Sequence, residues 1–136
     1  MAGIVRKIIQ TSRAPAAIGS YSQAVCVGQT LYISGQIGLH PTTGVMVEGG
    51  VVPETQQVMT NMGAILEAAG ASFDNVVKAT VMLEDINDFA AVNTEYAKNF
   101  SGNFPARALV QVAALPRGAK VEIEAIAIVG PITEES

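Results

Sequence analysis

Apolar and polar positions in the first third of the chain alternate in short runs that are typical of β-strands. Three such runs cover residues 4–11, 24–27 and 31–37, and Gly28-Gln29-Thr30 separates the last two. Short runs rich in β-branched side chains and bounded by glycine indicate strands, and the brief connection indicates a hairpin. A glycine inside a strand, such as Gly35, is typical of a bulge or of a close approach by another group.

The apolar spacing then changes to a helical period in two segments. We expect the first helix over residues 53–70 and the second over residues 89–102, after cap residues 85–88. Asn93 lies four residues after Phe89 and therefore shares the apolar face of the second helix. The apolar stripe of the first helix consists of Val58, Met59, Met62, Ile65, Leu66 and Ala69, and that of the second of Phe89, Val92, Tyr96 and Phe100.

Three further alternating runs, at residues 76–84, 107–112 and 121–128, complete the order β-β-β-α-β-α-β-β. This order predicts a two-layer α+β domain, in which a mixed six-stranded sheet carries both helices on one face. The opposite face would then expose apolar side chains. Since leaving apolar surface in water is unfavourable by about 25 cal/mol per Å², we expect a closed oligomer that covers it.

Composition narrows the class of protein. The 136 residues, 49% hydrophobic and 15% charged, predict one domain over residues 1–136 with frayed ends at 1–3 and 131–136. One cysteine and one histidine exclude an intrachain disulfide framework and a Cys/His zinc site within one chain, and no metal motif is present. The chain lacks an apolar run of the ~20 residues that span a bilayer and a secretory segment, so we expect no membrane association. We expect a cytoplasmic protein, and mitochondrial or nuclear pools are compatible with the sequence.

One arginine stands at the entrance of an apolar strand. Arg107 follows Phe104-Pro105-Ala106 directly. Its guanidinium group is always charged, and its planar fork suits a carboxylate. Placing it near apolar strands costs free energy unless an anion completes the site. That anion is either a glutamate at a subunit interface or the carboxylate of a ligand, and the residues alone leave both interpretations open.

Two carboxylates lie on one face of the last strand. Glu122 and Glu124 are separated there by about 7 Å. A solvated stripe is their ordinary interpretation, and we prefer it for Glu124. Ordinary structural roles also suit Tyr21, Ser34 and Asn93, as a loop aromatic, a strand hydroxyl and a polar group beneath a helix.

Taken together, these segments resemble the RidA (YjgF) family. The signature is Phe104-Pro105-Ala106-Arg107, followed by Leu115-Pro116 and by Val121-Glu122-Ile123-Glu124. Supporting stretches are residues 14–19, Tyr21, residues 34–37, residues 76–78, residues 85–89 and Val92-Asn93. The similarity covers about residues 4–130. It is strongest to the animal members, which are described as translation inhibitors or perchloric-acid-soluble proteins.

The resemblance implies a chorismate-mutase-like fold and a homotrimer with clefts between its subunits. It implies hydrolysis of 2-iminobutanoate and 2-iminopropanoate to 2-oxo acids and ammonia, without a cofactor. By position, Arg107 would bind the substrate carboxylate and Glu122 would position the attacking water. The cleft would be lined by Tyr21, Ser34, Gly35 and Asn93. Many relatives carry a cysteine where this chain has Leu109, so a thiol role is lost there while a ligand contact through the backbone N–H is retained.

Two other functions remain open. An endoribonuclease or translation inhibitor acting on mRNA would be expected to carry a basic surface, but the net charge is −4 and the basic residues are scattered. A non-catalytic binder of small carboxylates, or a chaperone, would use Arg107 equally well. Glu122 favours catalysis, because a carboxylate beside a bound ligand can accept a proton from water.

Overall fold

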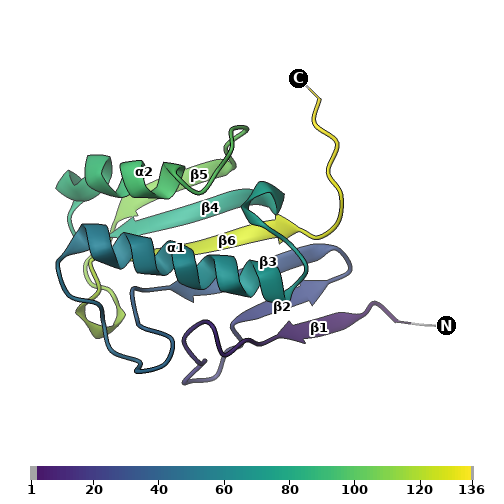
Figure 1. The fold of residues 1–136 in the computed structure, drawn as a ribbon, viewed down its shortest axis with the longest axis horizontal. Helices are drawn as coiled ribbons and strands as arrows, with labels where there is room; N and C mark the ends of the chain where they lie inside the picture. The colour runs from purple at the N-terminus through teal and green to yellow at the C-terminus, as the bar shows by residue number, and fades with distance from the viewer. Residues whose placement is uncertain (1–2, 136) are drawn as a thin grey trace.

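Six strands and two helices follow one another in the predicted order (Figure 1). The computed structural model describes residues 3–135. Its strands are β1 (Arg6–Ile9), β2 (Ala24–Val27), β3 (Thr30–Gln36), β4 (Val76–Leu83), β5 (Ala106–Gln111) and β6 (Val121–Ile128), and its helices are α1 (Val51–Ala68) and α2 (Phe89–Ala97). Short 3₁₀ turns lie at Phe73–Asn75, Ile86–Asp88 and Pro116–Gly118. The predicted α+β class is confirmed.

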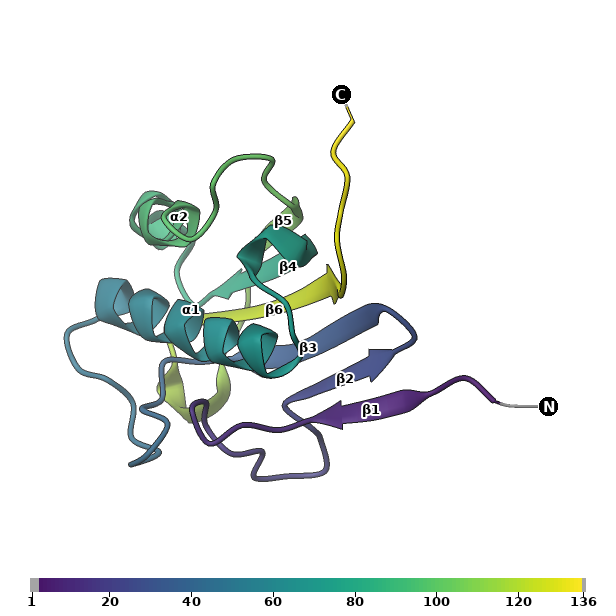
Figure 2. The ribbon, with the colours of Figure 1, turned by 45° about the vertical axis from the view of Figure 1, so that its right-hand side comes forward.

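The strands form one mixed sheet in the order β1-β2-β3-β6-β4-β5. Strands β4 and β5 pair in parallel, and all other neighbours are antiparallel. Both helices lie on the same side of this sheet, as Figures 1 and 2 show. The structure therefore has the two layers that the order of elements predicts.

The core lies between the sheet and the two helices. Strand β6 alternates strictly, and its core-facing residues are Val121, Ile123, Ala125 and Ala127, all at most 4% exposed. The predicted stripe of α1 is buried at Val58, Met59, Met62, Ile65 and Leu66. Burial of one large aliphatic side chain contributes about 1.5–3 kcal/mol to the free energy of unfolding. The core between the sheet and the helices is therefore a main source of stability.

The ends of several elements differ from the prediction. Helix α1 begins at Val51, two residues early; it accommodates Pro53 because the first four N–H groups of a helix have no partner within it. Strand β1 is shorter than residues 4–11, since its partner β2 has only four residues. Asp85 caps the 3₁₀ turn and not α2, and its carboxylate accepts the N–H of Asn87 at 2.9 Å. The other strands differ by at most one residue at each end.

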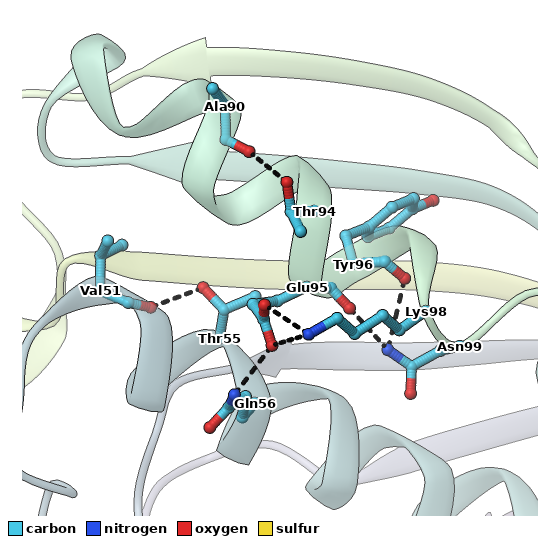
Figure 3. Close-up of polar contacts among 9 residues, drawn as sticks. All are labelled: Val51, Thr55, Gln56, Ala90, Thr94, Glu95, Tyr96, Lys98 and Asn99. Carbon is cyan, nitrogen blue, oxygen red and sulfur yellow. Dashed lines mark hydrogen bonds and ion pairs between the residues drawn. The ribbon is translucent and has the colours of Figure 1, made fainter.

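Helix α2 ends at Ala97, five residues before the predicted end. The side chain of Asn99 donates to the carbonyls of Glu95 and Tyr96, at 3.1 and 3.3 Å (Figure 3). These bonds satisfy carbonyl groups that would otherwise accept from a further helical turn, so the helix stops there.

A polar cluster fixes α2 against α1. Glu95 is only 9% exposed and accepts hydrogen bonds from Lys98 and from Gln56 of α1, both at 2.8 Å (Figure 3). Hydrogen bonds from Lys98 and then Gln56 lower the pKa of Glu95, so the carboxylate stays ionised. This cluster joins α2, the helix that also carries Asn93, to α1.

The sheet face opposite the helices is uncovered within residues 3–135 and carries large apolar side chains. Ile8, Tyr32, Val77 and Val110 are 41–51% exposed there or at its edges. The expected apolar face is therefore present. Residues 3–5 and 129–135 contain no helix or strand, and residues 1–2 and 136 of the predicted frayed ends lie outside the described part. Within residues 3–135, neither helix has the length and apolarity needed to cross a membrane.

Candidate functional site

Arg107 lies in a pocket between β5 and α2. It occupies the second position of β5 and pairs with the buried Ala79 of β4, so its side chain points to the helix side of the sheet. The pocket has a volume of about 380 Å³. This arginine pocket is lined by Asn93, Tyr96, Ala97, Phe104, Pro105 and Arg107.

Three side chains of α2 surround the guanidinium. The amide oxygen of Asn93 accepts a hydrogen bond from Nη1 at 2.9 Å. The Cζ atom of Arg107 lies 4.9 Å from the ring centroid of Tyr96 and 5.9 Å from that of Phe89, both within cation–π range. No carboxylate of residues 3–135 comes within ion-pair distance of Arg107. The described chain thus does not supply the anion that this fork is shaped to bind.

A second pocket lies on the opposite side of the sheet, around Glu122. Its volume is about 570 Å³, and it brings together Tyr21, Ser34, Gly35 and Glu122. Further lining residues of this glutamate pocket include Ile18, Leu39, Pro116, Arg117 and Glu124.

Local geometry fixes several of these groups. The hydroxyl of Ser34 donates to the carbonyl of Ser22 at 2.6 Å, which joins β3 to the loop that carries Tyr21. A Cβ atom at Gly35 would lie 2.5 Å from Oε2 of Glu122, so only glycine lets the carboxylate rest against β3. The register shift at this point of β3 confirms the irregularity that a glycine within a strand predicts.

The surroundings of Glu122 in the glutamate pocket favour the protonated form of its carboxyl group. Burial, and secondarily the negative charge of Glu124, raise the pKa of Glu122. Arg117 also lines the pocket, but its Nη2 atom donates to the carbonyl of Gly44 at 3.1 Å. A carboxyl group with a raised pKa can accept and return a proton nearer to neutral pH.

Sheet register separates the two pockets. Arg107 pairs with Ala79, whose side chain is in the core, whereas Glu122 pairs with Met82, whose side chain points to the other face. Alternate residues of a strand point to opposite faces, so Arg107 and Glu122 of one chain lie on opposite sides of the sheet. Asn93 belongs with Arg107, while Tyr21, Ser34 and Gly35 belong with Glu122. A site containing both charged groups therefore needs two copies of the chain.

Two other residues add to the sequence-based expectation. The side chain of Leu109 packs against the core and lines neither pocket, and the expected ligand contact through its backbone N–H stays a prediction. Tyr96 was expected only in the apolar stripe of α2, yet its ring lies beside the Arg107 guanidinium. Its position three residues after Asn93, on the same helix face, was the signal for this contact.

Comparison with known proteins places the chain in a family. The model of the family described as Endoribonuclease L-PSP matches residues 11–129. The chain belongs to this family, which is the RidA (YjgF) family. A goat (Capra hircus) relative named 2-iminobutanoate/2-iminopropanoate deaminase is 62% identical over 136 residues, which cover 100% of this chain and 99% of the relative.

Solved RidA-family structures confirm the fold. The crystal structure of RidA from the Antarctic bacterium Psychrobacter sp. is 53% identical and has a TM-score of 0.88, over 90% of this chain and 99% of that one. Escherichia coli TdcF, solved with bound serine, is 43% identical and has a TM-score of 0.87, over 91% and 99% of the two chains. The chorismate-mutase-like architecture expected from the resemblance thus agrees with the RidA-family neighbours.

Proposed function

We propose that this RidA-family protein is a cytoplasmic hydrolase that converts 2-iminobutanoate and 2-iminopropanoate to 2-oxo acids and ammonia. The name of the goat relative, 62% identical over the whole chain, supports this reaction. The serine bound in the TdcF structure supports a ligand that carries one carboxylate and one nitrogen substituent on a small carbon frame.

The active site is assembled between subunits of a homotrimer. One subunit contributes its arginine pocket and the next contributes its glutamate pocket, because the two lie on opposite sheet faces of a single chain. The uncovered apolar face supports such an assembly, since burying it between subunits removes it from water. Leu109 contributes a backbone N–H at the edge of this site.

The reaction needs one group that holds the substrate in place and one group that accepts and donates protons. Arg107 binds the substrate carboxylate. Only its Nη1 atom donates to Asn93 within residues 3–135, so the other N–H groups of the guanidinium can donate to the substrate. The imine nitrogen enters the site protonated. Water attacks the imine carbon and gives one proton to Glu122 while the C=N π electrons move to nitrogen, which forms a neutral carbinolamine. Glu122 then donates that proton to the amino nitrogen, and its carboxylate takes the hydroxyl proton as the C–N bond breaks, so ammonia leaves and the C=O bond of the 2-oxo acid forms. Ammonia takes the last proton from Glu122, which restores the carboxylate. No cofactor takes part in these reaction steps.

The observation that supports the proposal most strongly is that no carboxylate of residues 3–135 pairs with Arg107. Its guanidinium group is oriented by Asn93 and by aromatic rings, but no carboxylate within residues 3–135 neutralises it. An arginine that served only as an intrachain ion-pair partner would have a glutamate or aspartate beside it. These contacts exclude an intrachain ion pair among residues 3–135. Of the two anions left, a glutamate of a neighbouring subunit and the carboxylate of a ligand, we propose the ligand carboxylate, which the serine bound in the TdcF structure supports.

A coupled assay tests the proposal. Threonine dehydratase generates 2-iminobutanoate, and added protein should accelerate the appearance of 2-oxobutanoate. Arg107→Ala should lower kcat/KM by roughly 10- to 150-fold through loss of a charge-assisted interaction of about 1.5–3 kcal/mol. Glu122→Gln should lower kcat by about 10²- to 10⁴-fold. Arg13→Ala is the matched control, because Arg13 pairs with Glu67 on the surface; the absence of acceleration by the unmodified protein would reject the proposal.

RNA cleavage is the second candidate, because the family description names an endoribonuclease. The net charge of −4 disfavours it. RNA cleavage that persists in Arg107→Ala, while imine hydrolysis is lost, would assign the nuclease activity to a separate site or to a contaminant.

A further inference from the structure

The orientation of Arg107 is determined by more than its hydrogen bond. Asn93 accepts only one N–H, and one bond leaves a long arginine side chain free to turn about it. A second contact must therefore fix the plane of the guanidinium group before a carboxylate arrives. The described neighbours that face it are the rings of Tyr96 and Phe89.

Tyr96 is the better support of the two. It is 3% exposed and its ring centroid lies 4.9 Å from Cζ, whereas Phe89 is 44% exposed and lies at 5.9 Å. The Tyr96 ring is itself held by Phe100, with centroids 4.9 Å apart, and Phe100 contacts Phe104 edge-on at 5.9 Å. Tyr96 is thus buried and packed against a second ring, whereas nearly half of the Phe89 side chain is exposed to solvent.

Packing, and not hydrogen bonding, fixes this ring. The hydroxyl of Tyr96 is buried and has no hydrogen-bond partner among residues 3–135. Burial raises the pKa of this hydroxyl, and the Arg107 cation acts in the opposite direction, so the group stays neutral. The ring contacts the cation without accepting its N–H groups in hydrogen bonds, and these groups therefore stay available for a carboxylate.

We infer that the ring of Tyr96 is a positioning element of the proposed active site, which holds the guanidinium of Arg107 in the plane that binds the substrate carboxylate. This inference rests on the proposed function and adds a residue to it. Tyr96 acts through Arg107 and need not touch the substrate. Its three-residue spacing from Asn93 lets one face of α2 supply both the ring beside the guanidinium and the hydrogen-bond acceptor.

Ring substitution tests the inference with 2-oxobutanoate as the probe. Tyr96→Leu removes the ring and should weaken 2-oxobutanoate binding, measured by calorimetry, roughly 3- to 30-fold, the range of a cation–π contact. Tyr96→Phe keeps the ring and should retain the affinity. Phenylalanine with one, two or three ring fluorines at position 96 keeps the shape but depletes negative charge from the ring face. Affinity should fall stepwise with fluorine number, and KM should rise while kcat changes less than about twofold.

Val92→Ala is the matched control, because Val92 is a core residue of the same helix, 1% exposed, and does not line the arginine pocket. It should lower the melting temperature without changing 2-oxobutanoate affinity. A flat fluorine series, or a Tyr96→Phe variant as weak as Tyr96→Leu, would overturn the inference. If the unmodified protein neither binds 2-oxobutanoate nor hydrolyses the imine, the proposed function fails instead. The fluorinated series decides the matter even where Tyr96→Leu does not fold.

Discussion

At the residue scale, Gly35 and Glu122 form the tightest constraint in the glutamate pocket. A side chain at Gly35 would displace the carboxylate, since its Cβ would lie 2.5 Å from Oε2. Gly35→Ala should therefore lower kcat at least about tenfold, because a displacement near 1 Å can cost up to 10²-fold. The coupled assay measures it, and circular dichroism checks that the variant folds.

The double variant Gly35→Ala with Glu122→Gln is the internal control for that effect. If glycine acts through the carboxylate, the double variant should be no slower than Glu122→Gln alone, because residues that act as one unit are not additive. Fully additive losses would show that Gly35 affects some other part of the site.

The pKa of Glu122 predicts a pH dependence. Burial, and then the charge of Glu124, raise the pKa of Glu122, so the carboxylate that we propose as the base forms at a pH above the usual glutamate pKa of about 4.3. The value of kcat/KM should rise with pH, with its acidic midpoint above that value. Glu124→Gln removes the like charge and should move the midpoint to lower pH. Glu67→Gln, which changes an exposed carboxylate, should leave the profile where it is; a midpoint unaffected by Glu124→Gln would contradict the assignment.

Residue identities predicted only part of these contacts. The sequence placed Glu122 and Glu124 on one face of a strand and Asn93 on the apolar face of a helix, and both assignments are confirmed. The hydrogen bond from Arg107 to Asn93 joins a strand to a helix fourteen residues away. Such a contact depends on the tilt of α2 against β5, which local periodicity does not encode.

At the element scale, a buried carboxylate links α1 to β6. Glu54 is 4% exposed and accepts the backbone N–H of Lys120 at 2.9 Å, two residues before Glu122. The start of α1 therefore fixes the start of the strand that carries the proposed base. An acidic residue suits the first turn of a helix, but local sequence does not predict this contact, because the partner lies 66 residues away.

Removal of this link should destabilise the fold. Glu54→Ala leaves the Lys120 N–H without its acceptor and should lower the free energy of unfolding by about 1.5–3 kcal/mol, the range for a hydrogen bond to a charged group. Glu54→Gln retains an acceptor oxygen and should lose less. Urea unfolding measures both, with the exposed Glu67→Ala as control. Equal stability of Glu54→Ala and Glu67→Ala would show that the contact contributes nothing.

At the scale of the whole molecule, the uncovered sheet face predicts assembly. Tyr32 lies on this face beside Ile126 and is 51% exposed. Tyr32→Asp would place a charge within the expected interface, where burial of an unpaired charge is costly. Sedimentation should show a trimer for the unmodified protein and mostly monomer for this variant. Ile4→Asp, at an 82% exposed position before β1, should remain trimeric; a Tyr32→Asp trimer would remove this face from the interface.

The sequence predicted more of the fold than of the candidate site. Strand and helix periods give the order of elements, and two helices after a hairpin leave few two-layer arrangements. The strand order β3-β6-β4-β5, which puts the last strand between two earlier ones, depends on long-range pairing. That pairing places Arg107 and Glu122 on opposite faces of the sheet, so the proposed site would need two chains.

Mixing of two inactive variants tests the shared site most directly. Arg107→Ala and Glu122→Gln subunits would be unfolded together in equal amounts, refolded, and assayed for imine hydrolysis, with each variant refolded alone as control. If every site takes its arginine from one subunit and its glutamate from the next, random trimers should recover about a quarter of the unmodified activity. Mixed trimers that remain as inactive as either variant alone would contradict a site formed between two chains.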